Sequence, residues 1–323
     1  MKVRLHVGAA PVLPPGRRRA LCALVMGTLA AQSAVAIEID TGNPDWKLRW
    51  DNTVKASLMQ RLNDASPTLS AQPPLTVNQD DGDNNFKKGL VSSRIDLLSE
   101  LDLTGPGYGA RLSGAAWYDS VYNRATDNTT FTANHTPGSA FTTETRDLMG
   151  RKVELLDAFV YGNFDIGERR ASVRAGRHTL LWGESLFFGA NGIAGGMSPV
   201  DVVKAQSVPN TQFKEITRPV NQLSGTFQLT DDVSLGAYYQ LEWEQTRLPG
   251  AGSYFSTSDT IGEGNERLIV GAPFPAFLGG NPASPAAFFH GNDKEARSSG
   301  QGGLQLKYNA ETVEYGLYAI QYH

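Results

Sequence analysis

The chain has one cysteine among its 323 residues, and no apolar run long enough to cross a bilayer as a helix. Its clearest apolar run, residues 20–31, has 12 residues, whereas a membrane-spanning helix needs about 20. A lone thiol excludes an internal disulfide and a multi-cysteine metal site. Basic residues are also fewer than acidic ones, 29 against 33. Because binding to phosphates needs a basic surface, we expect no nucleic-acid partner.

The first 36 residues have the pattern of a secretory signal. Three arginines at 17–19 precede the apolar run, and small residues at 34–36 offer a cleavage site. We expect cleavage between Ala36 and Ile37, which would remove the cysteine and leave a net charge of about −9. A retained membrane anchor is the alternative, although the run is short for that role.

Apolar and polar residues alternate in one segment after another beyond residue 44. In residues 45–59, Trp50 and Val54 fall on one face, and Arg49 and Lys55 fall on the other. A period of two indicates β-strands rather than helices. Nine strands are expected, near residues 45–59, 91–103, 110–119, 153–164, 171–182, 222–229, 233–244, 302–308 and 312–322.

Short turns alternate with long polar connections, which we expect near residues 62–88, 123–150, 184–219 and 246–298. Long strands, turns that are short at one end only, and one charged face are together typical of membrane barrels, because lipid requires an apolar exterior. The sequence therefore predicts an all-β, antiparallel transmembrane β-barrel of the outer-membrane type. Since nine is an odd number, we expect the barrel to be incomplete in this chain. A soluble β-sandwich is the alternative.

The polar face of the strands would line the lumen of such a barrel, while aromatic side chains near strand ends would lie at the lipid headgroups. The lumen candidates are Arg49, Arg94, Asp96, Glu100, Arg111, Asp119, Arg174 and Glu242. The headgroup candidates are Trp46, Tyr118, Tyr122, Trp243 and Tyr315.

A glycine-rich run at residues 189–196 is too long for a turn and too irregular for a strand. Such a segment could fold into the lumen as a constriction, where charged side chains would set selectivity. The alternative is that the polar residues around it only anchor the loop by hydrogen bonds. The constriction or anchoring candidates are Arg177, Trp182, Glu184 and Asp201.

Catalysis, a metal and a cofactor are not expected. No motif of a hydrolase is recognised, and His178 is the only histidine after the cleavage site that lies within an expected strand. Asn78, Asp80, Gly82 and Asp83 partly match a calcium loop, but the spacing and the terminal Glu are absent. We therefore interpret this acidic run as a solvated loop.

Three stretches resemble a proteobacterial family catalogued as domain of unknown function 1302. They are residues 173–185, with Gly-Arg-His-Thr-Leu-Leu-Trp-Gly-Glu at their centre, residues 199–202 and residues 239–244. The resemblance implies an exported outer-membrane protein without an established activity or catalytic residue. It also implies longer chains, so we expect this one to be an N-terminal fragment. His178 replaces the Gln that is usual in the family motif.

The sequence thus favours a channel or transport component for small molecules, and the family context adds that these are hydrophobic or amphipathic. The expected partners are outer-membrane lipid, the barrel-assembly machinery and periplasmic transport proteins. A structural or docking barrel that binds a partner through its long loops is one alternative. A soluble secreted β-protein is the other.

Overall fold

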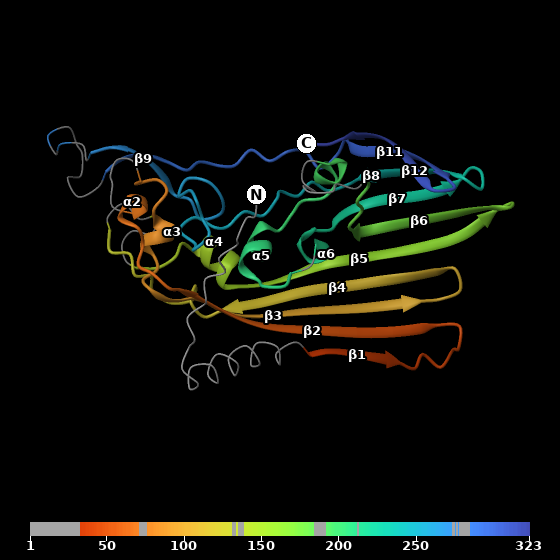
Figure 1. Cartoon of the computed structure of the whole chain (residues 1–323), viewed down its shortest axis with the longest axis horizontal. Helices are drawn as coiled ribbons and strands as arrows, with labels where there is room; N and C mark the ends of the chain where they lie inside the picture. The colour runs from red at the N-terminus through yellow and green to blue at the C-terminus, as the bar shows by residue number, and fades with distance from the viewer. Residues whose placement is uncertain are drawn as a thin grey trace, which may run out of the picture.

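The structure is a computed structural model that describes residues 33–70, 76–130, 134, 139–183, 192–211, 213–272, 275, 277 and 285–323. A ten-stranded antiparallel sheet dominates it, and its strands run along the long axis of the molecule (Figure 1). They are β1 (Ser33–Ile39), β2 (Lys47–Arg61), β3 (Gly89–Thr104), β4 (Tyr108–Asp119), β5 (Arg151–Ile166), β6 (Arg169–His178), β7 (Val220–Gln228), β8 (Val233–Gln240), β11 (Gln301–Ala310) and β12 (Val313–Gln321).

The strands follow one another across the sheet in chain order, and each of the nine expected strands has a counterpart. The all-β antiparallel prediction is confirmed. Two elements were missed. One is β1, which contains the expected cleavage bond between Ala36 and Ile37; residues 1–32 lie outside the described residues, so the signal peptide stays a prediction. The other is a separate hairpin of β9 (Arg267–Gly271) and β10 (Ala286–Phe289).

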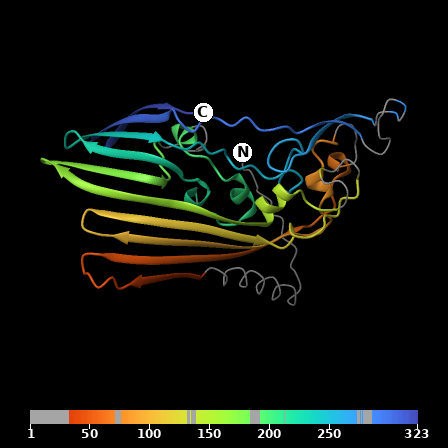
Figure 2. The same ribbon diagram turned by 180° about the vertical axis from the view of Figure 1, so that it is seen from behind.

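The sheet is open in this chain, with β1 and β12 as its edge strands. The five short turns between strands lie at one end of the sheet, and the four long connections lie at the other (Figures 1 and 2). These connections are residues 62–88, 120–150, 179–219 and 241–300. The last two begin earlier than expected, because β6 ends at His178 and β8 ends at Gln240.

Among the described residues, short helices occur only in the long connections. They are α2 (Pro67–Ser70), α3 (Asp81–Asn84), α4 (Thr143–Thr145), the π-helical turn Arg146–Gly150, the 3-10 turn Ile193–Gly196, α5 (Val202–Ser207) and α6 (Phe213–Ile216). Within the described residues, no helix is long and apolar enough to cross a membrane.

One face of the sheet is apolar and exposed, and the other is polar and buried. A soluble sandwich has the reverse arrangement, because its buried faces are apolar. Val153 is 84% exposed on one face, which we call the outer face, whereas Asp119 is 1% exposed on the other, the inner face. Exposed apolar residues of the outer face are Trp50, Val54, Leu58, Ile95, Leu97, Leu112, Leu155, Val160, Val173, Leu223, Leu235, Leu304, Leu306 and Leu317. Buried polar residues of the inner face are Arg94, Asp96, Ser113, His178, Gln222, Ser224, Gln240, Gln301 and Gln305.

The long connections form an apolar core of their own at their end of the sheet, which we call the loop core. Its buried members are Phe86, Val91, Val121, Tyr122, Phe141, Leu148, Met149 and Val203. Two expectations were wrong here, because loops that are distant in sequence fold over one another. Tyr122 lies inside the loop core rather than at a strand end facing lipid, and the acidic run at Asp80 and Asp81 is buried rather than solvated.

Gly176 in β6 supplies a prediction about the sheet itself. Its φ is +118°, and an added Cβ would lie 2.3 Å from the Ala158 carbonyl oxygen of β5. A left-handed backbone and overpacking each cost about 1–3 kcal/mol. We expect Gly176→Ala to lower the free energy of unfolding by at least about 2 kcal/mol in a urea titration of the folded chain.

Gly162 of β5 is the matched control, because an added Cβ there meets nothing within 4 Å. Gly162→Ala should change stability by less than about 1 kcal/mol. Equal losses in the two variants would contradict the register of β5 and β6.

Candidate functional site

Residues 192–219, which we call the inner segment, cross the inner face of the sheet. At one side Met197 packs with Tyr238 of β8, and Tyr318 and Ile320 of β12 border the same cluster. At the other side the Lys55 ammonium of β2 lies 2.7 Å from the Glu215 carboxylate of α6. The described part of the glycine-rich run therefore lies over the polar face. Its role as a constriction stays a prediction.

Asp201 fixes the position of α5 within the inner segment. Its side chain accepts a hydrogen bond from the Lys204 backbone N–H at 2.8 Å, which caps the helix. Its second oxygen accepts from the Arg247 guanidinium at 2.7 Å. A single carboxylate thus starts the helix and ties it to the connection that follows β8.

Arg247 is the best buried cation of this region, with 4% of its side chain exposed. It lies between Asp201 and Glu154 of β5, whose carboxylate is 2.5 Å away, and 5.5 Å from the Trp117 ring centre. Burial alone would lower the pKa of the Arg247 guanidinium, but its two carboxylate partners outweigh burial and raise the pKa. The residue therefore stays charged and holds three parts of the chain together.

Ion pairs continue from Glu154 across the inner face. Arg218 lies 4.0 Å from Glu154 and 2.7 Å from Glu244. Arg177 then lies 3.0 Å from Glu244 and 2.6 Å from Glu242. We call the seven residues from Asp201 to Glu242 the ion-pair network. It joins β5 and β6 to the inner segment and to the chain after β8.

A cavity of about 520 Å³, the inner pocket, lies between the inner segment and strands β3 to β6. This volume is typical of sites for small molecules. Its charged lining residues are Glu100, Arg111, Asp157, Arg174, Lys204 and Glu215. Its large apolar lining residues are Leu98, Leu156, Phe159, Leu181 and Phe213.

The two arginines of the inner pocket differ in their partners. Arg111 contacts three carboxylates, those of Glu100, Asp102 and Asp157. Arg174 stacks over the Phe159 ring at 4.8 Å, and among the described residues no carboxylate forms an ion pair with it. Arg174 is thus a cation beside an apolar wall, and it can accept an anionic group of a ligand.

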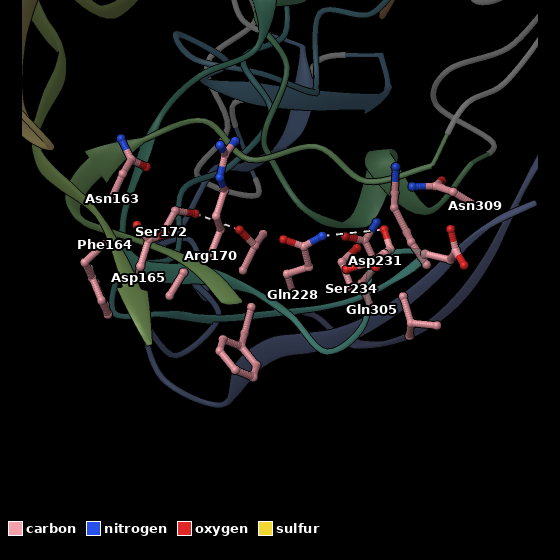
Figure 3. Close-up of a pocket in the computed structure, with 16 residues that line it drawn as sticks. Asn163, Phe164, Asp165, Arg170, Ser172, Gln228, Asp231, Ser234, Gln305 and Asn309 are labelled. Atoms are coloured by element: carbon pink, nitrogen blue, oxygen red, sulfur yellow. Dashed lines mark hydrogen bonds between the residues drawn. The ribbon is translucent and has the colours of Figure 1, made fainter. Parts of the chain in front are cut away.

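A second hollow, of about 780 Å³, lies on the inner face at the end with the short turns (Figure 3). Its lining comes from β5 to β8 and β11, and most of the lining residues are polar. Arg170, Ser172, Gln228, Ser234 and Gln305 are among the lining residues. Polar surface therefore extends along the inner face from the inner pocket to the short turns.

The sequence-predicted lumen residues lie in four different surroundings. Glu100, Arg111 and Arg174 line the inner pocket, and Glu242, just beyond the end of β8, belongs to the ion-pair network. Arg49 is exposed and pairs with Asp51. The remaining three are buried and satisfied, because Arg94 pairs with Asp96, and Asp119 accepts from Ser92, Ser93 and Val121.

The four constriction candidates do not form one site. Arg177 and Asp201 belong to the ion-pair network, whereas Trp182 lies in the apolar cluster with Met197 and Tyr238. Glu184 lies outside the described residues. His178 is buried, and its two ring nitrogens lie 2.9 Å from the Gly176 carbonyl and 2.8 Å from the Ser224 hydroxyl. Each nitrogen thus has a hydrogen-bond partner within the sheet.

Sequence reasoning missed several residues that hold the inner segment. Lys55 alternates with apolar neighbours in β2, so the signal used for the lumen candidates could have found it. Arg218, Glu215 and Arg247 lie in long connections that have no period. Only the tertiary fold brings Arg218 and Arg247 to Glu154, and Glu215 to Lys55.

A family model described as protein of unknown function (DUF1302) matches residues 17–323. The chain belongs to this family. The family description names no activity, so membership in DUF1302 confirms the resemblance without assigning a role. No curated protein and no solved structure gives a significant match to the chain.

Arg247 of this DUF1302 chain yields a prediction about the ion-pair network. Arg247→Met leaves Glu154 and Asp201 buried without their shared cation, and breaking a buried ion pair in this way costs about 3–5 kcal/mol. We expect a loss of that size in the free energy of unfolding, measured by urea titration.

The matched control is Arg169→Met, because Arg169 pairs with Asp231, whose side chain is 90% exposed. Such surface pairs contribute at most about 1 kcal/mol. Equal midpoints of urea unfolding for the two arginine variants would contradict a stabilising role of the network.

Proposed function

We propose that this chain belongs to an outer-membrane β-barrel that conducts small amphipathic molecules. The observation that carries the proposal is the sidedness of the sheet, with exposed apolar residues outside and buried polar residues inside. Lipid would cover the outer face, and water and cargo would meet the inner face. A soluble secreted protein would instead leave the whole apolar face in water.

Closure of the barrel is part of the proposal. The edge strands β1 and β12 carry backbone groups that lipid cannot satisfy. The complete protein would therefore pair them with further strands. In membrane barrels the short turns face the periplasm and the long connections face the outside. Export by the signal, the barrel-assembly machinery and periplasmic transport partners belong to the same proposal.

The inner pocket supports an amphipathic cargo with an acidic group. Arg174 offers a positive charge, and Phe159, Leu181 and Phe213 offer apolar surface beside it. Lys204 and Glu215 of the inner segment complete the lining. A molecule in this pocket would thus contact the segment that crosses the inner face.

A specific observation favours the docking alternative. The long connections share the loop core, so they form a packed layer rather than separate mobile loops. A packed layer is a suitable surface for a partner protein. Conduction by the complete protein separates the two functions, because a docking barrel can be sealed.

The outer face gives the first test. Leu223 of β7 points outward and is half exposed, while Thr226 on the same strand faces inward beside Ser172. An arginine facing lipid near mid-bilayer costs about 2–4 kcal/mol. We expect Leu223→Arg to reduce the amount of protein folded into outer membranes, and Thr226→Arg to leave it near the wild-type level, as measured by fractionation and heat-modifiable mobility. Equal tolerance of the two arginines, or release of the wild type without detergent, would refute a lipid-facing surface.

Conductance across planar bilayers gives the second test. Glu215→Gln removes the ion pairs with Lys55 and Lys204 without changing the shape of the side chain. We expect the complete protein to conduct, and this variant to conduct more strongly or to fluctuate more between levels. Glu311→Gln, in the exposed turn after β11, should behave like the wild type. A wild-type barrel that never conducts would instead favour docking.

A further inference from the structure

Three carboxylates from distant parts of the chain meet beneath the long connections. Asp80 and Asp81 belong to the connection 62–88, and Asp259 belongs to the connection 241–300. One oxygen of each lies within 4.8 Å of the others. The three residues are 4%, 1% and 3% exposed, so water does not screen their charges.

The connection 120–150 reaches the same cluster through Asp81. Asn128 donates its side-chain amide to one Asp81 oxygen at 3.1 Å. Asn134 donates its backbone N–H at 3.0 Å and its side-chain amide at 3.1 Å to the other oxygen. Asp81 is thus held in place from a second connection, and three of the four long connections meet here.

The other two carboxylates are only half satisfied. Asp80 accepts from the Thr76 hydroxyl at 3.0 Å, and Asp259 accepts from the Asp81 backbone N–H at 3.3 Å, each through Oδ2. Their Oδ1 atoms are buried and have no hydrogen-bond partner among the described residues. The side-chain oxygens of Asn85 and Ser253, which lie in the same two connections, are also buried and have no hydrogen-bond partner among the described residues. Buried oxygens without donors are an observation independent of the clustering, and a bound ion is one way in which such oxygens are satisfied.

The charges of the cluster point the same way. Three carboxylates are buried together here, and Arg267 is a positive charge that acts on Asp81. Buried charges persist when they are paired or when they coordinate a metal ion.

We propose that Asp80, Asp81 and Asp259 bind one calcium ion. The donors are all oxygens, which hard cations prefer, and within the part of the chain that the structure describes no nitrogen or sulfur ligand that would favour zinc belongs to the cluster. Oxygens that share one calcium lie up to about 5 Å apart, since each bond is about 2.3–2.6 Å long. Calcium also accepts irregular sets of six to eight oxygens, whereas magnesium requires near-octahedral geometry.

The ion would join the connections 62–88 and 241–300 directly, and the connection 120–150 through the amides on Asp81. It would therefore stiffen the layer that the long connections form at their end of the sheet (Figure 1). The proposal revises the expectation that no metal binds, and it does not depend on conduction. Sites of extracellular modules typically have dissociation constants of about 10⁻⁴–10⁻³ M, so calcium at about millimolar concentration should fill this one.

Calcium chloride alone is the probe. The complete protein is freed of metal with a chelator in detergent at pH 8, titrated by calorimetry, and digested with a protease with and without calcium. We expect one ion per chain and slower cleavage within the connection 241–300. Asp259→Asn should weaken binding by at least about tenfold, because affinity follows the number of ligand charges. Asp64→Asn, an exposed carboxylate in the connection 62–88, should bind as the wild type does.

Asp80→Asn tests the same site independently if Asp259→Asn does not fold. The β-sheet signal in circular dichroism shows whether each variant is folded. Two results would overturn the proposal. One is a wild type that neither binds calcium nor gains protease resistance at millimolar concentration. The other is an Asp259→Asn protein that folds and binds calcium as tightly as the wild type. A cluster that is merely protonated gives the first result.

Discussion

The structure depends on how the buried polar groups of the inner face are satisfied. A charge removed from water persists only with a partner, and Arg247 shows the consequence most clearly. It brings Glu154 of β5 and Asp201 of the inner segment together. Because those partners come from different parts of the chain, pairing them fixes the inner segment on the sheet. The fold of the segment is therefore set by electrostatics more than by helix propensity, since α5 and α6 span only 6 and 4 residues.

The same constraint explains the layer formed by the long connections. Apolar residues of the loop core bring distant connections together, and their packing removes water from Asp80, Asp81 and Asp259. Hydrophobic packing thus buries carboxylates whose oxygens are hydrogen-bonded only in part. The amides of Asn128 and Asn134 serve Asp81, while oxygens of Asp80 and Asp259 remain without donors.

The sequence predicted the sheet well because alternation is a local property. Lys55 and Val54 take opposite faces of β2 whatever the rest of the chain does. Contacts between connections are not local, so Arg247, Arg218 and Glu215 could not be assigned to a site. Tyr122 and the acidic run at Asp80 were misread for the same reason, since composition does not reveal which segment folds over a loop. β1 was missed because its first residues also fit a signal sequence.

The two sides of the inner segment are held by different kinds of interaction. Toward β8 and β12 the side chains of Met197 and Trp182 make apolar contacts, and the Gln240 amide of β8 donates to the Met197 carbonyl at 2.5 Å, so among the described residues this side contains no ion pair that a charged ligand could replace. Toward β2 the contact is an ion pair between Lys55 and Glu215, and Glu215 also lines the inner pocket. In the proposed channel, a charged group that enters the pocket would compete for this pair, because an anion can replace the Glu215 carboxylate as the partner of the Lys55 ammonium. The side at β12 would then be the fixed end of the segment, and the side at β2 would be the end that a charged cargo releases.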